Sequence, residues 1–267
     1  MDSFTDQAFA GNPAGVVRLD DRDRYPADEW CAAVAAELNL SETAFVGPTD
    51  EPGADFRLRW FTPTIEVDLC GHATLAAARC LFEDGVPSPV RFATRSGVLT
   101  IEAAADGELV MDFPAQPPTP IEPPADLTAA LGVEPLWVGA GGEDYLVELA
   151  DAATVRSLTP DVAAIGRYPV RGVIVTAPAD DTDGIDFVSR FFCPAVGIPE
   201  DPVTGSTHTL LGPYWAGKLG RDQVIGWQAS RRGGRIGVAV VGDRVRLTGQ
   251  AVVVMDGRFT EPAAAPA

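Results

Sequence analysis

Two stretches of the sequence decide the fold: RWFTPTIEVDLCGHATLAAA, which begins at Arg59, and RFFCPAVGIPEDPVTGSTHTLLG, which begins at Arg190. They repeat each other in outline, because Cys70 follows Arg59 by eleven positions and Asp201 follows Arg190 by eleven positions. A Gly-His pair at positions 71 and 72 then corresponds to a Gly-Ser pair at positions 205 and 206. A repeat of this kind predicts two similar structural units within one chain.

The flanks of the two copies agree with this repeat. Short apolar runs precede each copy, and alternating apolar and polar residues follow it around Asp106-Gly107 and Gly242-Asp243, which indicates a β-hairpin in each half. The segment Ala73–Phe82 is apolar nearly all round and predicts a helix that other structure must cover. We therefore expect an α+β protein of two pseudo-symmetric domains, each a β-barrel-like sheet wrapped round a central helix.

The clearest boundary lies at residues 113–127, whose six prolines cannot continue a helix or a central strand. We expect an N-terminal domain at 1–113, a stiff linker at 114–126, a C-terminal domain at 127–260 and a disordered tail at 261–267. Residues 28–40 show helical spacing of apolar residues, and Pro213 is expected to kink or end the central helix of the second half.

The charge balance excludes several partners. The chain carries 38 acidic and 20 basic side chains, a formal charge of −18, so nucleic acid and anionic membrane surfaces would be repelled. No apolar run approaches the roughly 20 residues that span a bilayer, and no signal peptide is recognisable, which favours the cytoplasm. The four cysteines form no CxxC pair and the two histidines no zinc motif, so we expect neither a disulfide nor a metal site.

Five motifs together resemble one known family, the PhzF-like phenazine-biosynthesis proteins, which share the diaminopimelate epimerase fold. They are FAGNPAGVV at 9–17, SETAF at 41–45, RWFTPTIEVDLCGHATLA at 59–76, EDPVTGSTH at 200–208 and SRRGG at 230–234. The resemblance covers nearly the whole chain in order. It implies a homodimeric isomerase that needs no cofactor and acts on a small carboxylate-bearing substrate held between its two domains.

Glu42 is the candidate acid/base. It lies between a turn and an apolar strand, where partial desolvation can raise a carboxyl pKa toward neutrality. Taken alone, SETAF favours a solvated glutamate that caps a turn, because exposed glutamates are the commonest kind. The resemblance implies that Glu42 is the proton-transfer residue of the family.

The two glycine-containing pairs are expected where each central helix begins. Free backbone N–H groups at Gly71 and Gly205 suit a carboxylate or a developing enolate. His72 is either a substrate-polarising group or a core imidazole. Asp201 and Ser206 are either turn and cap residues or, as the resemblance implies, site residues that hold the substrate and donate to its carboxylate.

Two alternatives to this isomerase are open. The first is an epimerase or racemase, because such relatives use one cysteine thiol from each half. In the repeat that starts at the two arginines, however, the residue that corresponds to Cys70 is Asp201, and Cys193 lies eight residues too early. A two-thiol racemase is therefore disfavoured. A non-catalytic small-molecule-binding protein that retains the site is the second alternative, and His208 is expected to be structural, because its spacing from Ser206 points the side chains apart on a helix.

Overall fold

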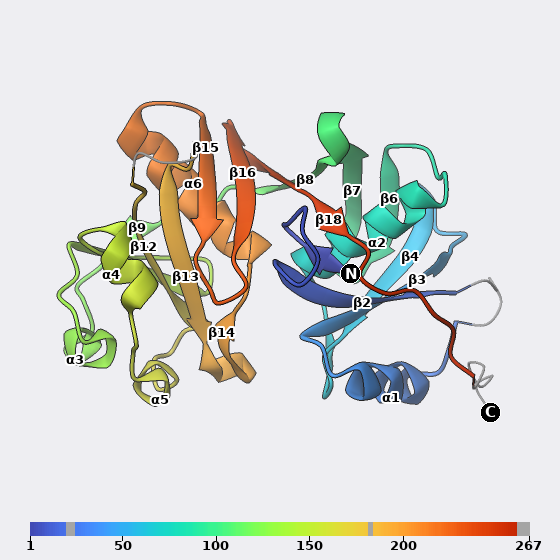
Figure 1. Ribbon diagram of the computed structural model, residues 1–267, viewed down its shortest axis with the longest axis horizontal. Helices are drawn as coiled ribbons and strands as arrows, with labels where there is room; N and C mark the ends of the chain where they lie inside the picture. Colours follow the sequence, from blue (N-terminus) through green and yellow to red (C-terminus); the bar gives the residue numbers. More distant parts are fainter. Residues whose placement is uncertain (20–24, 181–183, 261–267) are drawn as a thin grey trace. The chain divides into compact units, whose positions relative to one another are not determined.

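The computed structural model describes residues 1–19, 25–180 and 184–260, and the chain forms two compact units. Unit 1 consists of Met1–Asp112 and the C-terminal segment that begins at Gly249, and unit 2 of Phe113–Thr248 (Figure 1). The tail predicted to be disordered, 261–267, lies outside the described residues. Within the described part of the chain, no helix is both long and apolar enough to cross a bilayer.

Unit 1 is built on a single curved sheet. Its strands, in spatial order, are β18 (Ala251–Val252), β1 (Asp2–Ser3), β2 (Asn12–Arg18), β3 (Glu42–Pro48), β4 (Phe56–Phe61), β6 (Val90–Thr94), β7 (Gly97–Ala103) and β8 (Leu109–Pro114). The short β5 (Glu66–Val67) also pairs with β4. The β2–β3 and β4–β6 pairs are parallel, and the other pairs are antiparallel.

Unit 2 repeats this plan strand for strand. Its order is β9 (Thr119–Pro120), β10 (Trp137–Gly141), β11 (Asp144–Glu148), β12 (Gly172–Pro178), β13 (Phe187–Cys193), β15 (Gln223–Gln228), β16 (Gly234–Val241) and β17 (Arg244–Gly249), with β14 (Ile198–Asp201) on β13. Here β11–β12 and β13–β15 are the parallel pairs. The same sequence of pairings in both units confirms the predicted pseudo-symmetric α+β fold, including the hairpins β7–β8 and β16–β17.

The central helix of unit 1 is α2 (Gly71–Glu83), which begins two residues before the predicted start. Every residue from His72 to Ala78 is buried, as is Leu81. The helix contacts β1, β2, β3, β7 and β18, so the sheet covers it from several sides (Figure 1). Full burial of each leucine in such a helix stabilises the fold by about 1.5–3 kcal/mol.

Shorter helices cover the outside of each sheet. In unit 1, α1 (Asp28–Leu38) packs its buried face on β3 and β4. It ends two residues earlier than predicted, because Asn39 caps it with a left-handed φ of 49°. In unit 2 the covering helices are α3 (Leu127–Leu131), α4 (Ala152–Ser157) and α5 (Val162–Ile165). They pack on a core cluster formed with β12 and β13.

The central helix of unit 2, α6 (Gly205–Leu219), continues through Pro213, so of the two predicted effects of this proline the structure contradicts an end of the helix. A proline lacks the N–H that would bond the carbonyl four residues earlier, here that of Thr209. The N–H of Gln116 donates to the Thr209 carbonyl instead, at 2.9 Å. A hydrogen bond from another segment therefore satisfies the group that the proline leaves unpaired.

The division of the chain differs from the predicted one in two places. The proline-rich segment 114–126 belongs to unit 2, because β9 pairs with β10 and the Ala115 N–H donates to the Asp243 carbonyl at 2.8 Å. Residues 249–260 belong to unit 1, because Ala251 and Val252 pair with Ser3 and Asp2. Strand pairing thus overrides the boundary that proline content indicated.

The close approach of α6 to β16 generates a stability prediction. A Cβ at Gly212 would lie 2.4 Å from Val238 Cγ1, whereas a Cβ at Gly217 on the same helix would meet no atom within 4 Å. We expect Gly212→Ala to lower the free energy of unfolding by about 1–3 kcal/mol through overpacking. Gly217→Ala should raise it by up to about 1 kcal/mol, since alanine is the better helix former.

Urea unfolding of both variants against the wild type measures these differences. Equal effects of the two substitutions would contradict the close packing of α6 on β16.

Candidate active site

The predicted acid/base residue opens β3 in unit 1. The Oε2 atom of Glu42 lies 3.3 Å from Nε2 of His72, which belongs to the first turn of α2. The two side chains are 14% and 7% exposed. The structure therefore brings together the predicted residues Glu42, Gly71 and His72 in unit 1.

The imidazole of His72 is held from its other nitrogen. Nδ1 lies 3.3 Å from the amide nitrogen of buried Asn12 and 3.5 Å from Sγ of Cys70. Because an amide nitrogen only donates, Nδ1 accepts from Asn12 and the ring proton resides on Nε2. Nε2 is buried, and no described residue forms a well-aligned hydrogen bond with it. Its N–H thus faces the carboxylate of Glu42.

Burial also decides the charge of His72. Desolvation lowers its pKa to about 3, because the charged imidazolium loses its hydration. His72 is therefore neutral across the physiological pH range. A neutral imidazole places an N–H donor beside Glu42 without adding a positive charge there.

Three potential metal ligands meet at this point. Glu42, Cys70 and His72 each offer a donor atom, and these atoms lie within 4.8 Å of one another. Carboxylate, thiolate and imidazole are ligands that zinc uses. Glu42 and Cys70, however, approach opposite nitrogens of the imidazole ring, whereas one ion binds a single ring nitrogen. The absence of a metal from the site stays a prediction.

The predicted residues Asp201, Gly205 and Ser206 lie in unit 2, around the start of α6. The hydroxyl of Thr204 donates to Asp201 Oδ2. The Gln228 side chain bridges this loop, since its amide nitrogen donates to the Asp201 carbonyl at 2.8 Å and its oxygen accepts from the Thr204 N–H at 2.9 Å. Asp201 is thereby held in one position.

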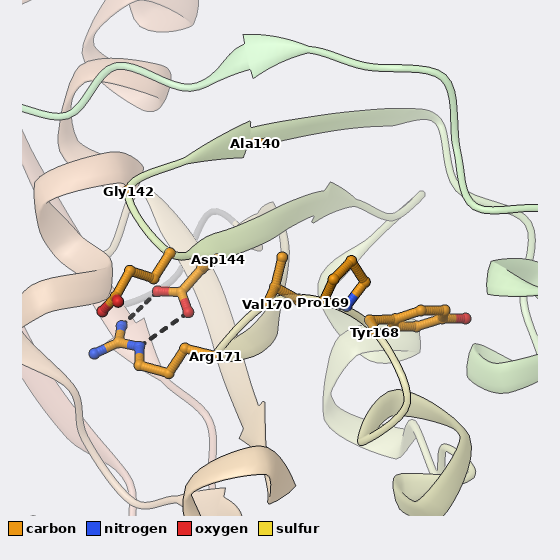
Figure 2. A pocket seen from close by; sticks show the side chains of 8 residues that line it. Ala140, Gly142, Asp144, Tyr168, Pro169, Val170 and Arg171 are labelled. Carbon is orange, nitrogen blue, oxygen red and sulfur yellow. Dashed lines mark hydrogen bonds and ion pairs between the residues drawn. The ribbon is translucent and has the colours of Figure 1, made fainter.

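Sequence reasoning missed two residues beside Ser206. Nη1 of Arg171 donates to the Ser206 hydroxyl at 3.1 Å, and the same guanidinium forms an ion pair with buried Asp144. Figure 2 shows both contacts of the Arg171 guanidinium with Asp144. Neither residue belongs to a recognisable motif, and the strand pairing β11–β12 alone brings them together.

His208 lies in the core of unit 2. It is fully buried, and its Nδ1 lies 2.8 Å from the Thr204 carbonyl, to which it donates. Burial lowers its pKa to about 4, so it is neutral near pH 7. It bonds to the helix start rather than to the side chain of Ser206.

Comparisons with known proteins show the family of the chain. The family model of the phenazine biosynthesis-like proteins, PhzC-PhzF, matches residues 1–257. The chain belongs to this family. An uncharacterized isomerase of Halalkalibacterium halodurans is 46% identical over 261 residues, 96% of this chain and 95% of the relative. An uncharacterized isomerase of Pseudomonas aeruginosa is 48% identical over 259 residues, 96% of each chain.

A crystal structure also resembles this phenazine biosynthesis-like protein. A putative PhzC/PhzF protein from Clostridium difficile superposes with a TM-score of 0.88 at 39% identity, covering 97% of both chains. The similarity extends over both units of the fold. The chain is thus an isomerase of the phenazine biosynthesis-like family.

Two equivalent ion pairs in this isomerase show which residue of unit 2 corresponds to Cys70 of unit 1. Arg59 forms a bidentate pair with Glu66, and Arg190 forms the same pair with Glu200. Each glutamate lies five positions before the glycine that opens the central helix. The residue that corresponds to Cys70 is therefore Thr204, and the predicted correspondence with Asp201 is wrong.

The strand register gives a second correspondence. Phe45 pairs with Arg59 and Val175 pairs with Arg190, so the position of Glu42 in unit 1 is that of Gly172 in unit 2. A Cβ at Gly172 would lie 2.5 Å from the Phe192 carbonyl oxygen. Unit 2 therefore has no room for a second carboxylate at the corresponding place.

The neutral buried histidines predict a pH dependence of stability. The folded-state pKa of His208 lies below the unfolded value, so on acidification the unfolded chain takes up the proton first. The contribution of His208 is complete above about pH 6.5 and is lost as the pH falls toward 4. His208→Gln should make the decline in unfolding free energy below pH 6.5 shallower, by up to about 1.4 kcal/mol per pH unit.

Urea unfolding of wild type and variant from about pH 8 to about pH 5 measures the two slopes. Since the slopes are compared, an offset in absolute stability does not matter. Identical slopes would mean that His208 takes up its proton over the same pH range in the folded and the unfolded protein, so that burial does not lower its pKa.

Proposed function

We propose that this isomerase moves a proton on a small unsaturated or carbonyl-activated carboxylic acid without a cofactor. Glu42 removes the proton from one carbon as a carboxylate and returns it to another as a carboxylic acid, so the reaction is balanced. The observation that carries the proposal is the contact of the Glu42 carboxylate with the neutral, buried imidazole of His72. The family resemblance of SETAF supports the same role.

The other predicted residues have supporting roles in this proposal. Asp201, fixed by Thr204 and Gln228, holds the substrate or assists its protonation. Ser206 donates its hydroxyl proton to the substrate carboxylate. Backbone N–H groups at Gly71 and Gly205 stabilise negative charge that develops on the substrate. The homodimer and the cytoplasmic location stay predictions from the sequence.

A one-carboxylate mechanism is favoured over two-base racemisation. The position of Glu42 corresponds to Gly172, and that of Cys70 to Thr204, whose hydroxyl is bonded to Asp201. A racemase with one thiol from each unit would need a cysteine at Thr204. Proton return by the same Glu42 carboxyl group accounts for the asymmetry.

The central test is Glu42→Gln, which preserves size and polarity but removes the ionisable group. Cyclic and amino carboxylic acids are screened in deuterated water by proton NMR, where an enzyme exchanges substrate protons and a mere binder only broadens lines. We expect Glu42→Gln to reduce deuterium incorporation by about 100-fold or more. Glu51→Gln, at an exposed position in the same unit, is the matched control. Full exchange by Glu42→Gln would refute the assignment.

Cys70→Ala distinguishes the racemase alternative. The Cys70 thiol approaches Nδ1 of His72, whereas Glu42 lies beside Nε2, so removal of the thiol should leave turnover within a factor of about 5. A loss comparable to that of Glu42→Gln would instead favour thiol chemistry. Turnover of the substrate found in the NMR screen is the measurement.

A further inference from the structure

Unit 2 contains a cavity that no predicted residue accounts for. Its volume is about 510 Å³, and it is lined by the β10–β11 turn at Gly142 and by the segment Tyr168–Arg171 that leads into β12. Figure 2 shows Tyr168 and Pro169 toward one end and the Arg171–Asp144 pair toward the other. The cavity thus places the cationic Arg171 beside two carboxylates, Glu143 and Asp144, with apolar side chains at the other end.

The guanidinium of Arg171 is held rigidly. Its Nε donates to Asp144 Oδ1 at 3.0 Å, its Nη2 pairs with Asp144 Oδ2, and it lies 5.0 Å from the centre of the Phe191 ring. The Asp144 side chain is 2% exposed, whereas that of Arg171 is 27% exposed. One edge of the guanidinium is therefore buried, and part of the group remains accessible.

Counting donors shows what Arg171 can still bind. A guanidinium has five N–H groups, of which two bond to Asp144 and one to Ser206. The remaining two, one on each terminal nitrogen, have no acceptor among the described residues. Paired N–H groups on a planar guanidinium suit the two oxygens of a carboxylate.

The same contact fixes the hydroxyl of Ser206. Because arginine can only donate, the Ser206 oxygen must accept from Arg171, and the hydroxyl proton is left to donate to another acceptor. A ligand carboxylate would satisfy this donor and the spare N–H groups of Arg171 together. Asp144 pairs with Arg171 and Glu143 also lines the cavity, so the site has no surplus positive charge, which favours a monoanion over a polyanion such as a phosphate.

We infer that Arg171 is a substrate-binding residue: with Ser206 it binds the carboxylate of the substrate, and Asp144 positions its guanidinium. This inference extends the proposed function, since the role of Ser206 belongs to that proposal. It adds a residue that lies outside every motif of the sequence. The cavity beside Arg171 would receive the part of the ligand next to the carboxylate.

The test compares benzoate with its neutral isostere benzamide as probes of the full-length protein. Dissociation constants come from NMR titration. The wild type should prefer benzoate by about 10-fold or more, the range expected for hydrogen bonds to a charged group. The double variant Arg171→Gln/Asp144→Asn replaces the buried ion pair by neutral groups of similar shape, so that no charge is left unpaired. In it, the preference should fall to within about 2-fold of unity.

Two further variants separate binding from folding. Arg171→Lys keeps the positive charge but loses the planar array of N–H donors. Its preference for benzoate should fall between those of the wild type and the double variant. Arg221→Lys changes an arginine of the Arg221–Asp186 ion pair beyond the far end of α6 and should keep the full preference. Unfolding curves verify that every variant is folded.

The inference is overturned if the wild type shows no preference for benzoate, or if the folded double variant retains it. Deuterium exchange by Glu42→Gln reports on the proposed function separately. Loss of the benzoate preference in the double variant together with full exchange by Glu42→Gln would retain Arg171 as an anion-binding residue and reject the acid/base assignment. The opposite pair of results would reject the inference alone.

Discussion

The structure depends on the need to cover an apolar helix. The side chains of α2 from His72 to Ala78 point in all directions round the helix axis, and all are buried. A flat sheet covers one face of a helix, so the strands must curl, and unit 1 recruits β1 and β18 from the two ends of the chain to extend the cover. The first turn of the helix carries the polar side chain of His72. Covering the helix thus also sets where the chemical groups lie.

Duplicated ion pairs determine how each chain segment enters its helix. Arg59 and Arg190 each fix a glutamate on the following short strand, and from that glutamate both units need five residues to reach the helix. The connections differ in the hairpin between the arginine and its glutamate. This hairpin is three residues longer in unit 2 and contains the turn Pro194–Val196. Because Asp201 follows this longer hairpin, it corresponds to Val67 and not to a residue of the helix start.

This difference also shows how far the sequence could predict the structure. Alternating residues, hairpin turns and the apolar run at 73–82 reflect local preferences for strand, turn and helix. The repeated arginines reveal the duplication. The fold class, both central helices and the residues at their starts were therefore predictable. Counting along the chain could not reveal a three-residue hairpin extension. Nor could it reveal Arg171, because its partners Asp144 and Ser206 are distant in sequence: β11 brings Asp144 to it by strand pairing, and the start of α6 brings Ser206. The hydrogen bond from the Gln116 N–H to the Thr209 carbonyl also joins residues that are distant in sequence, so it could not be predicted either.

The same backbone carries different chemistry in the two units. Glu42 and neutral His72 can accept or donate protons, whereas the corresponding positions hold Gly172, which has no side chain, and Ser206. Ser206 is locked as a donor by Arg171, an arrangement that binds anions but cannot exchange protons near neutral pH. The chain thus has two equivalent frameworks, and in the proposed function substitutions at a few positions let one serve proton transfer and the other binding. Two-base racemisation requires the halves to remain chemically alike, and the divergence at these positions argues against it.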